Sequence, residues 1–131
     1  MTPRPAIAAC RRVVIKLGTR VLTHDDGRLA LARLFDVVEA AAAARNQGWD
    51  VLLVSSGALG LGREALGLNP ALDDLAARQA CAAVGQSRLM ALYEQGFTRV
   101  GLVCGQVLLT EGDFDDRLRY LNLRSTLLAL L

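Results

Sequence analysis

A strand–helix–strand pattern in the first half of the chain places the strongest limit on its fold. Residues 13–15 are three consecutive β-branched residues, which predicts a strand buried on both faces of a parallel sheet. From 28 to 47, apolar residues recur at three- and four-residue spacing, which predicts an amphipathic helix. Residues 51–54 predict a second short, buried strand. Together they indicate an α/β fold built on a right-handed βαβ unit.

Lys16 interrupts the first apolar run near its end, and Gly18 and Thr19 follow it. A lysine cannot remain in a dry sheet without a partner, so we expect the strand to end here and Lys16 to project from its C-terminal edge. Open α/β sheets bind ligands at that edge, and a glycine there lets backbone amides approach an anion. The stretch therefore predicts a phosphate site. A strand-end lysine in solvent explains it equally well, because K-x-G is common by chance.

A second candidate site follows the second strand, where Ser55, Ser56 and Gly57 form a turn before a predicted helix. Such a turn presents hydroxyl groups and unpaired helix N–H groups, which suit a carboxylate or a phosphate. Gly57, Gly60 and Gly62 resemble a dinucleotide fingerprint only loosely, since the order of the glycines differs. The alternative is an ordinary serine N-cap followed by glycines that allow tight packing.

A long helix is predicted over residues 75–95, with Gly85 in its middle. Glycine costs about 1 kcal/mol in a helix interior relative to alanine, so we expect another element, or another subunit, to approach closely there. The expected residues at the helix ends are Asp25 or Asp26 before the first helix, Gly48 after it, Asp73-Asp74 before the long helix, Gly96 after it, and Asp113 before a final helix.

The last third of the chain predicts a strand over residues 101–110, parallel to the first two, and then the final helix. The charged residues of that helix favour a solvated, salt-bridged face over a ligand site; they are Arg117, Arg119 and Arg124 beside Asp115 and Asp116. The sequence stops in an apolar run without a capping residue. We therefore expect an interrupted fold whose open strand edge and apolar helix face drive association.

Composition excludes several classes of protein. The chain has 131 residues, 53% of them hydrophobic and 21% charged, which indicates one globular domain or part of one. A net charge of +2 is too small to favour nucleic acid, and no apolar run reaches the length of a membrane span. Residues 1–11 are predicted to be a disordered leader whose apolar run is too short for a secretory signal, which favours the cytoplasm. Cys10, Cys81 and Cys104 belong to no metal motif.

Three stretches resemble, in their order along the chain, the glutamate 5-kinases, a branch of the amino acid kinase family. They are V-I-K-L-G-T at 14–19, V-S-S-G-A at 54–58 and A-C-A-A-V-G-Q-S-R-L-M at 80–90. Residues 106–110 and 119–122 are similar too. The first motif is shared by the whole family, whereas 80–90 separates this branch from the aspartate, acetylglutamate and uridylate kinases.

The resemblance implies a three-layer α/β/α sandwich with a mainly parallel sheet, of which residues 12–131 are the N-terminal part. It implies transfer of the γ-phosphoryl group of ATP, with Mg²⁺, to the side-chain carboxylate of L-glutamate. The product would be glutamyl 5-phosphate, in the first step of proline biosynthesis. The matching residues are Lys16, Gly18 and Thr19 for the ATP phosphates, with Lys16 as the catalytic charge, and Ser56, Gly57 and Ala58 for glutamate.

The resemblance further implies a homo-oligomer and proline as a feedback inhibitor. The half of the family's domain that binds adenine and ribose has no counterpart in residues 12–131, which leaves the activity of this chain alone open. The other possibilities are another member of the family, a non-catalytic fragment that associates with a full-length kinase, and a plain nucleotide- or anion-binding α/β module.

Overall fold

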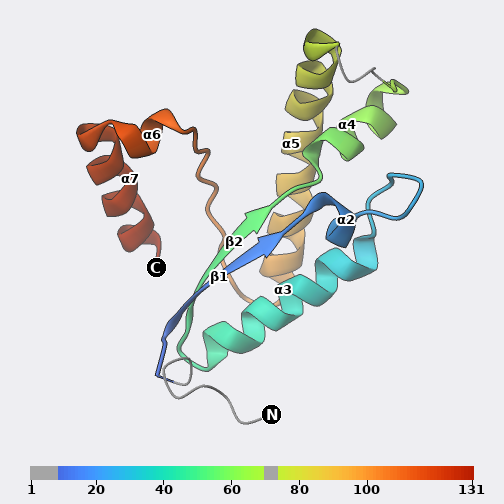
Figure 1. Cartoon of the computed structure of the whole chain (residues 1–131). Coiled ribbons are helices and arrows are strands. Elements are labelled where there is room, and N and C mark those ends of the chain that lie inside the picture. Colours follow the sequence, from blue (N-terminus) through green and yellow to red (C-terminus); the bar gives the residue numbers. More distant parts are fainter. Residues whose placement is uncertain (1–8, 70–73) are drawn as a thin grey trace.

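The computed structural model describes residues 9–69 and 74–131 (Figure 1). In chain order its elements are β1 (Arg12–Leu17), α2 (Thr19–Leu22), α3 (Leu31–Asn46), β2 (Asp50–Ser55), α4 (Ala58–Leu66), α5 (Leu75–Arg99), α6 (Gly112–Asp115) and α7 (Arg117–Leu130). This is a mixed α/β chain, as predicted. The predicted leader, residues 1–11, lies mostly outside the described residues, and β1 begins at Arg12.

The two strands form a parallel sheet joined by α3, which confirms the predicted strand–helix–strand unit. Their register pairs Arg12 with Asp50 at one end and Leu17 with Ser55 at the other. Parallel pairing brings both carboxyl ends to the same edge of the sheet (Figure 1). The turns that follow Leu17 and Ser55 are therefore neighbours in space.

The prediction that the first strand is buried on both faces is wrong. Burial alternates along β1, and Val14 is 62% exposed. On β2, Val54 is 51% exposed. Ile15, Val51 and Leu53 pack instead against the helices on the opposite face. Three consecutive β-branched residues favour an extended backbone, but they carry no period that distinguishes one covered face from two.

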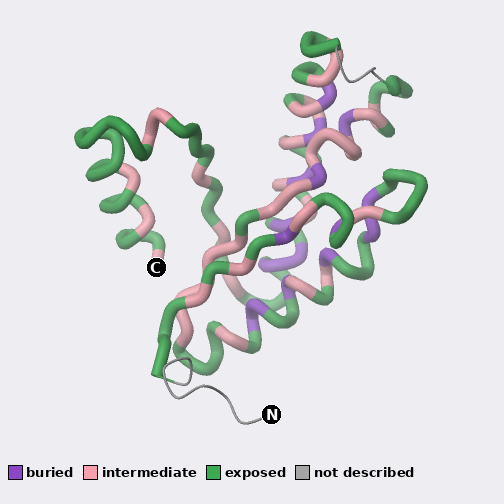
Figure 2. Tube along the Cα trace, in the orientation of Figure 1, coloured by how far each residue is buried: buried purple, intermediate pink, exposed green. Residues whose placement is uncertain are grey.

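Helices α3 and α5 build the core together. The buried apolar cluster draws on β1, the α2 region and both helices; its members are Leu17, Leu22, Leu29, Leu34, Val38, Ala41, Leu89, Tyr93 and Phe97. Among the described residues, every buried position lies between Leu17 and Phe97 (Figure 2). The core therefore lies between one face of the sheet and helices α3 and α5, while α6 and α7 contribute no buried residue.

Two glycines bring α4 and α5 into backbone contact. A Cβ atom at Gly62 would overlap the carbonyl oxygen of Cys81. A Cβ atom at Gly85 would overlap the carbonyl oxygen of Ala58 and lie 2.7 Å from the nitrogen of Gly62. The predicted close approach at Gly85 is confirmed, and the approaching element is α4.

For α3, the predicted cap by Asp25 or Asp26 is wrong, whereas the predicted end at Gly48 is right. Ala30 precedes α3 and has no polar side chain that could cap the helix; the Asp26 carboxylate instead accepts the Arg28 N–H at 3.0 Å and so holds the preceding turn. After α3, Gly48 adopts a φ of 81°, a left-handed conformation that suits glycine at a helix end.

For α5, the predicted cap is right and the predicted end is wrong. Asp74 caps the helix by accepting the Ala77 N–H at 2.9 Å, as predicted, while Asp73 lies outside the described residues. Gly96 does not end the helix, which runs on to Arg99. Gly96 is buried, and a Cβ atom there would lie 3.1 Å from the Val38 side chain, so this glycine serves the packing of α5 on α3.

Residues 102–110 form no strand, contrary to the prediction. Leu102 and Cys104 pack against the core, but Val103 is fully exposed, and the segment leaves the sheet towards α6 (Figure 1). A β-rich composition predicts an extended backbone, whereas a strand also needs a partner edge, and the described part of the sheet pairs β1 with β2 alone.

Asp116, not Asp113, caps the final helix by accepting the Arg119 N–H at 2.8 Å. The Asp113 carboxylate accepts the backbone N–H and the hydroxyl of Thr110 at 2.7 and 2.8 Å, which lowers the pKa of Asp113. The predicted salt bridges on α7 are not formed between described residues; Arg12, Arg28 and Arg45 form ion pairs elsewhere in the described chain.

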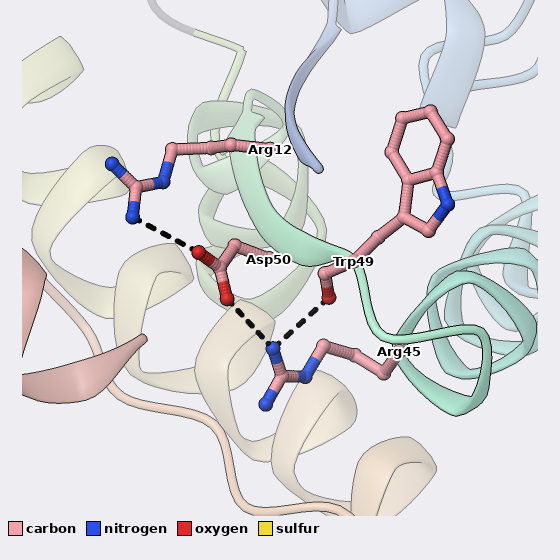
Figure 3. A network of polar contacts seen from close by, with 4 residues as sticks. All are labelled: Arg12, Arg45, Trp49 and Asp50. Atoms are coloured by element: carbon pink, nitrogen blue, oxygen red, sulfur yellow. Dashed lines mark hydrogen bonds and ion pairs between the residues drawn. The ribbon is translucent and has the colours of Figure 1, made fainter. Parts of the chain in front are cut away.

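A polar network holds the sheet at the end opposite the two turns (Figure 3). The Asp50 carboxylate contacts Arg12 of β1 at 2.9 Å and Arg45 of α3 at 3.1 Å, and Arg45 also donates to the Trp49 carbonyl. This network fixes the starts of both strands relative to α3.

Across residues 9–69 and 74–131, no helix has the length and apolar character needed to cross a membrane.

Candidate functional site

The two predicted site turns meet at the carboxyl edge of the sheet. The backbone N–H of Ser56 donates a hydrogen bond of 3.1 Å to the carbonyl oxygen of Leu17. This bond continues the strand register by one residue and joins the turn after β1 to the turn after β2. The structure thus brings Lys16, Gly18 and Thr19 together with Ser56, Gly57 and Ala58, six residues that sequence analysis had assigned to two separate stretches.

Lys16 is the penultimate residue of β1 and lies on its exposed side. The prediction that its side chain leaves the core is confirmed. The ammonium nitrogen lies 3.9 Å from the point that a Cβ atom would occupy at Gly18, so the side chain reaches along the turn. Within the described part of the chain Lys16 has no ion-pair partner, which leaves its charge available to a ligand.

Gly18 is a glycine that the fold does not require. Its φ of −71° is open to any residue, and the ammonium of Lys16 is the one described group that a Cβ atom would meet within 4 Å. Thr19 follows as the first residue of the single-turn helix α2, where its carbonyl accepts the Thr23 hydroxyl. A glycine without a conformational or packing reason, next to a free lysine, favours close approach by a ligand.

The second turn has a different reason for its glycine. Gly57 precedes α4 with a φ of 113°, a conformation that L side chains rarely adopt, and it is buried. Ala58 begins α4, whose first N–H groups have no partner inside the helix. The Ser56 side chain is half-buried, and its hydroxyl makes no hydrogen bond with any described residue.

The alternative interpretation of this turn, a serine N-cap followed by glycines that allow tight packing, is half right. No serine caps α4, because Gly57 occupies the N-cap position and makes no side-chain hydrogen bond. Tight packing does explain the later glycines: Gly62 faces α5, and a Cβ atom at Gly60 would lie 3.0 Å from the Gly27 carbonyl oxygen. The Ser56 hydroxyl therefore has no structural use in the described chain, while Gly60 and Gly62 do.

Sequence analysis missed the part that α5 plays in holding this turn. Gly85 packs on the Ala58 carbonyl, so α5 fixes the first residue of α4. Tyr93 places its hydroxyl 2.7 Å from the hydroxyl of Ser55 at the end of β2. Burial raises the pKa of Tyr93 above the ordinary value of a phenol, which is already neutral at pH 7. Gly85, in the middle of a predicted helix, was the sequence signal for the contact with Ala58. No sequence signal pointed to the contact between Tyr93 and Ser55.

The charges of the chain single out Lys16 more sharply than its local motif does. It is the only lysine among fifteen basic residues, the others all being arginine. Arginine presents a planar, forked guanidinium, whereas lysine presents a compact point charge on a flexible stem. All the remaining basic residues of the chain are arginine, and the one lysine side chain lies at the sheet edge, beside Gly18. Sequence analysis overlooked this count.

The described residues contain no group of three His, Cys, Asp or Glu side chains that could hold a metal ion. Cys10, Cys81 and Cys104 form no disulfide bond with one another. What the described edge offers a ligand is therefore the ammonium group of Lys16, the hydroxyl groups of Ser56 and Thr19, and backbone N–H groups. This is a donor set for anions such as phosphate and carboxylate, not for a cation.

Comparison with known proteins identifies the relatives of this chain. The profile of the amino acid kinase family matches residues 11–131. Curated proteins named "Glutamate 5-kinase" are 49% identical in Moorella thermoacetica over 128 residues and 46% identical in Myxococcus xanthus over 130 residues. These alignments cover 98% and 99% of this chain but 34% of each relative, so the chain spans about a third of their length. With a match over nearly all of its residues, the chain belongs to the amino acid kinase family.

Proposed function

We propose that this chain supplies the acceptor site and one phosphate-binding lysine of a glutamate 5-kinase. The reaction is ATP-dependent phosphorylation of the side-chain carboxylate of L-glutamate to glutamyl 5-phosphate, the first step of proline biosynthesis. The observation that carries the proposal is the Ser56–Leu17 hydrogen bond, which joins the two anion-binding turns at one sheet edge. The choice of glutamate as substrate rests on the relatives named "Glutamate 5-kinase", which are 46–49% identical to this chain.

In this proposal Lys16 holds the transferring phosphoryl group. Phosphoryl transfer needs little covalent help from the protein; it needs aligned reactants and positive charge where negative charge is concentrated. Lys16 provides a free ammonium group, and Gly18 with Thr19 forms the turn along which the phosphates approach. ATP is the co-substrate. Mg²⁺ accompanies it, and the described residues are assigned no part in holding the metal.

Ser56, Gly57 and Ala58 hold the glutamate. The Ser56 hydroxyl is free, and the N–H groups at the start of α4 carry the partial positive charge of a helix N-terminus. Gly57 permits the left-handed turn that starts the helix next to Ser56. These donors suit a carboxylate acceptor held beside the phosphoryl group at Lys16.

The proposal extends to the finer features of the family. The exposed face of β1 and β2 suggests a further layer, so we propose that the complete fold is a three-layer α/β/α sandwich with a mainly parallel sheet. Residues 12–131 form the N-terminal part of that domain. We also propose a cytoplasmic homo-oligomer that proline inhibits.

Titration of the 131-residue chain with each substrate tests the division of labour. Because the described site has one lysine and no metal-binding cluster, we expect calorimetry to detect glutamate and to give a much weaker signal for ATP. Binding of ATP with no response to glutamate would support a plain nucleotide-binding module instead. D-Glutamate serves as the control, since its charges are the same and its geometry is not.

A serine substitution tests the acceptor role. The assay is best run in a hybrid kinase, in which residues 11–131 replace the matching segment of the Moorella thermoacetica relative. Ser56→Ala is expected to raise the half-saturating glutamate concentration about tenfold or more, the usual effect of removing a hydrogen bond to a charged group. The half-saturating ATP concentration should stay unchanged.

Ser125→Ala, an exposed serine of α7, is the matched control for loss of a hydroxyl group. Equal changes in the requirements for glutamate and ATP would remove Ser56 from the acceptor site. So would a Ser56→Ala hybrid with the kinetics of the unsubstituted hybrid.

A further inference from the structure

The peptide groups of Ser56 are held on both sides, while its side chain is left free. Its N–H donates to the Leu17 carbonyl at 3.1 Å, and its carbonyl accepts the Ser55 hydroxyl at 3.3 Å. We assign the Tyr93 phenol as the donor of its 2.7 Å hydrogen bond to Ser55, because the single proton of the Ser55 hydroxyl is donated to that carbonyl. A chain of hydrogen bonds thus runs from Tyr93 through Ser55 to the peptide of Ser56.

Tyr93 is well suited to act as the fixed end of this chain. It is 4% exposed, and its ring is stacked on Phe97 with the centroids 6.2 Å apart. Both rings belong to the core cluster shared by α3 and α5. The strand period places Ser55 on the same face of β2 as the core residues Val51 and Leu53. Ser55 therefore links a rigid core side chain to the turn beside it.

We propose that Tyr93 is a positioning residue for the acceptor carboxylate, acting through Ser55 on the peptide of Ser56. The inference rests on the proposed function and adds to it. By fixing the Ser56 carbonyl, Tyr93 sets the direction in which the Ser56 backbone enters Gly57 and α4. The free hydroxyl of Ser56 and the first N–H groups of α4 then meet the carboxylate in one constant geometry. Tyr93 itself touches no substrate.

Tyr93→Phe in the hybrid kinase is the direct test, because it removes one hydroxyl group and keeps the core ring. We expect the half-saturating glutamate concentration to rise about fivefold, the factor that corresponds to the usual net worth of one hydrogen bond. The half-saturating ATP concentration should not change. Tyr120→Phe, on the exposed helix α7, is the matched control.

Ser55 variants show whether the two hydroxyl groups act as one unit. Ser55→Ala should raise the glutamate requirement to the same extent, and Ser55→Ala combined with Tyr93→Phe should add nothing further. Ser55→Thr keeps the hydroxyl group and should retain the unsubstituted kinetics. Additive effects of the two single variants, or an equal loss of ATP affinity, would overturn the proposal and assign Tyr93 to stability alone.

A readout without substrate separates this inference from the proposed function. In the 131-residue chain, Tyr93→Phe is expected to speed hydrogen exchange at the Ser56 amide relative to the amides of α3. Faster exchange together with unchanged glutamate kinetics in both Tyr93→Phe and Ser56→Ala would refute the acceptor site itself. If Ser56→Ala impairs glutamate use while Tyr93→Phe changes neither exchange nor kinetics, the positioning role alone is refuted.

Discussion

Replacing Lys16 by alanine is expected to lower the turnover number of the hybrid kinase about 10²- to 10³-fold, the usual cost of losing one preorganised group that stabilises transition-state charge. The side chain is exposed and has no ion-pair partner among the described residues, so the substitution removes no contact of the core. Thermal unfolding should therefore be unchanged. Steady-state kinetics at saturating ATP and glutamate measure the effect.

Two variants sharpen the interpretation of Lys16→Ala. Arg20→Ala removes another exposed cation four residues further on and should leave turnover unchanged. Lys16→Arg keeps the charge but replaces a compact ammonium by a planar guanidinium, so we expect it to restore little of the lost activity. Normal turnover in Lys16→Ala, or equal losses in Lys16→Ala and Arg20→Ala, would show that the phosphate site lies elsewhere.

The backbone elements that carry the site were predictable because their signals are local. The β-branched run at 13–15 and the apolar spacing over 28–47 define the strand and the helix without help from the rest of the chain. The failures are of the opposite kind. Whether a strand has one covered face or two, and whether 101–110 pairs at all, depends on neighbours that the local sequence does not specify.

The same division holds for the candidate site. Sequence analysis could find Lys16 and Ser56 because one lies in the last two residues of a strand and the other directly follows one, and parallel strands end at one edge. It could not find the chain of hydrogen bonds that starts at Tyr93, because a buried tyrosine on a helix resembles any other core aromatic residue. Nor could it distinguish Gly18, which the fold does not need, from Gly57, whose left-handed φ does require glycine. Those distinctions depend on backbone angles and contacts across the chain.

Gly85→Ala is expected to have the largest effect on stability. The added methyl group would overlap the Ala58 carbonyl oxygen, so α4 and α5 must move apart along their whole crossing. Overpacking of this kind costs about 3 kcal/mol, and the better helix propensity of alanine returns about 1 kcal/mol. The net loss of about 2 kcal/mol corresponds to a fall in Tm of roughly 6–12 °C. Circular dichroism of the 131-residue chain measures it.

Gly96→Ala is the control, because it makes the same substitution in the same helix with the same gain in propensity. There the new Cβ atom would meet side-chain atoms of Val38 and Phe35 at 3.1–3.3 Å, and side chains can adjust where a backbone carbonyl cannot. Its Tm should change little. Because Ala58 begins α4, the displaced helix in Gly85→Ala should also raise the glutamate requirement of the hybrid kinase, whereas Gly96→Ala should not. Equal effects of the two variants on Tm would show that α4 does not press on α5 at Gly85, and α5 would then lose its part in placing the acceptor turn.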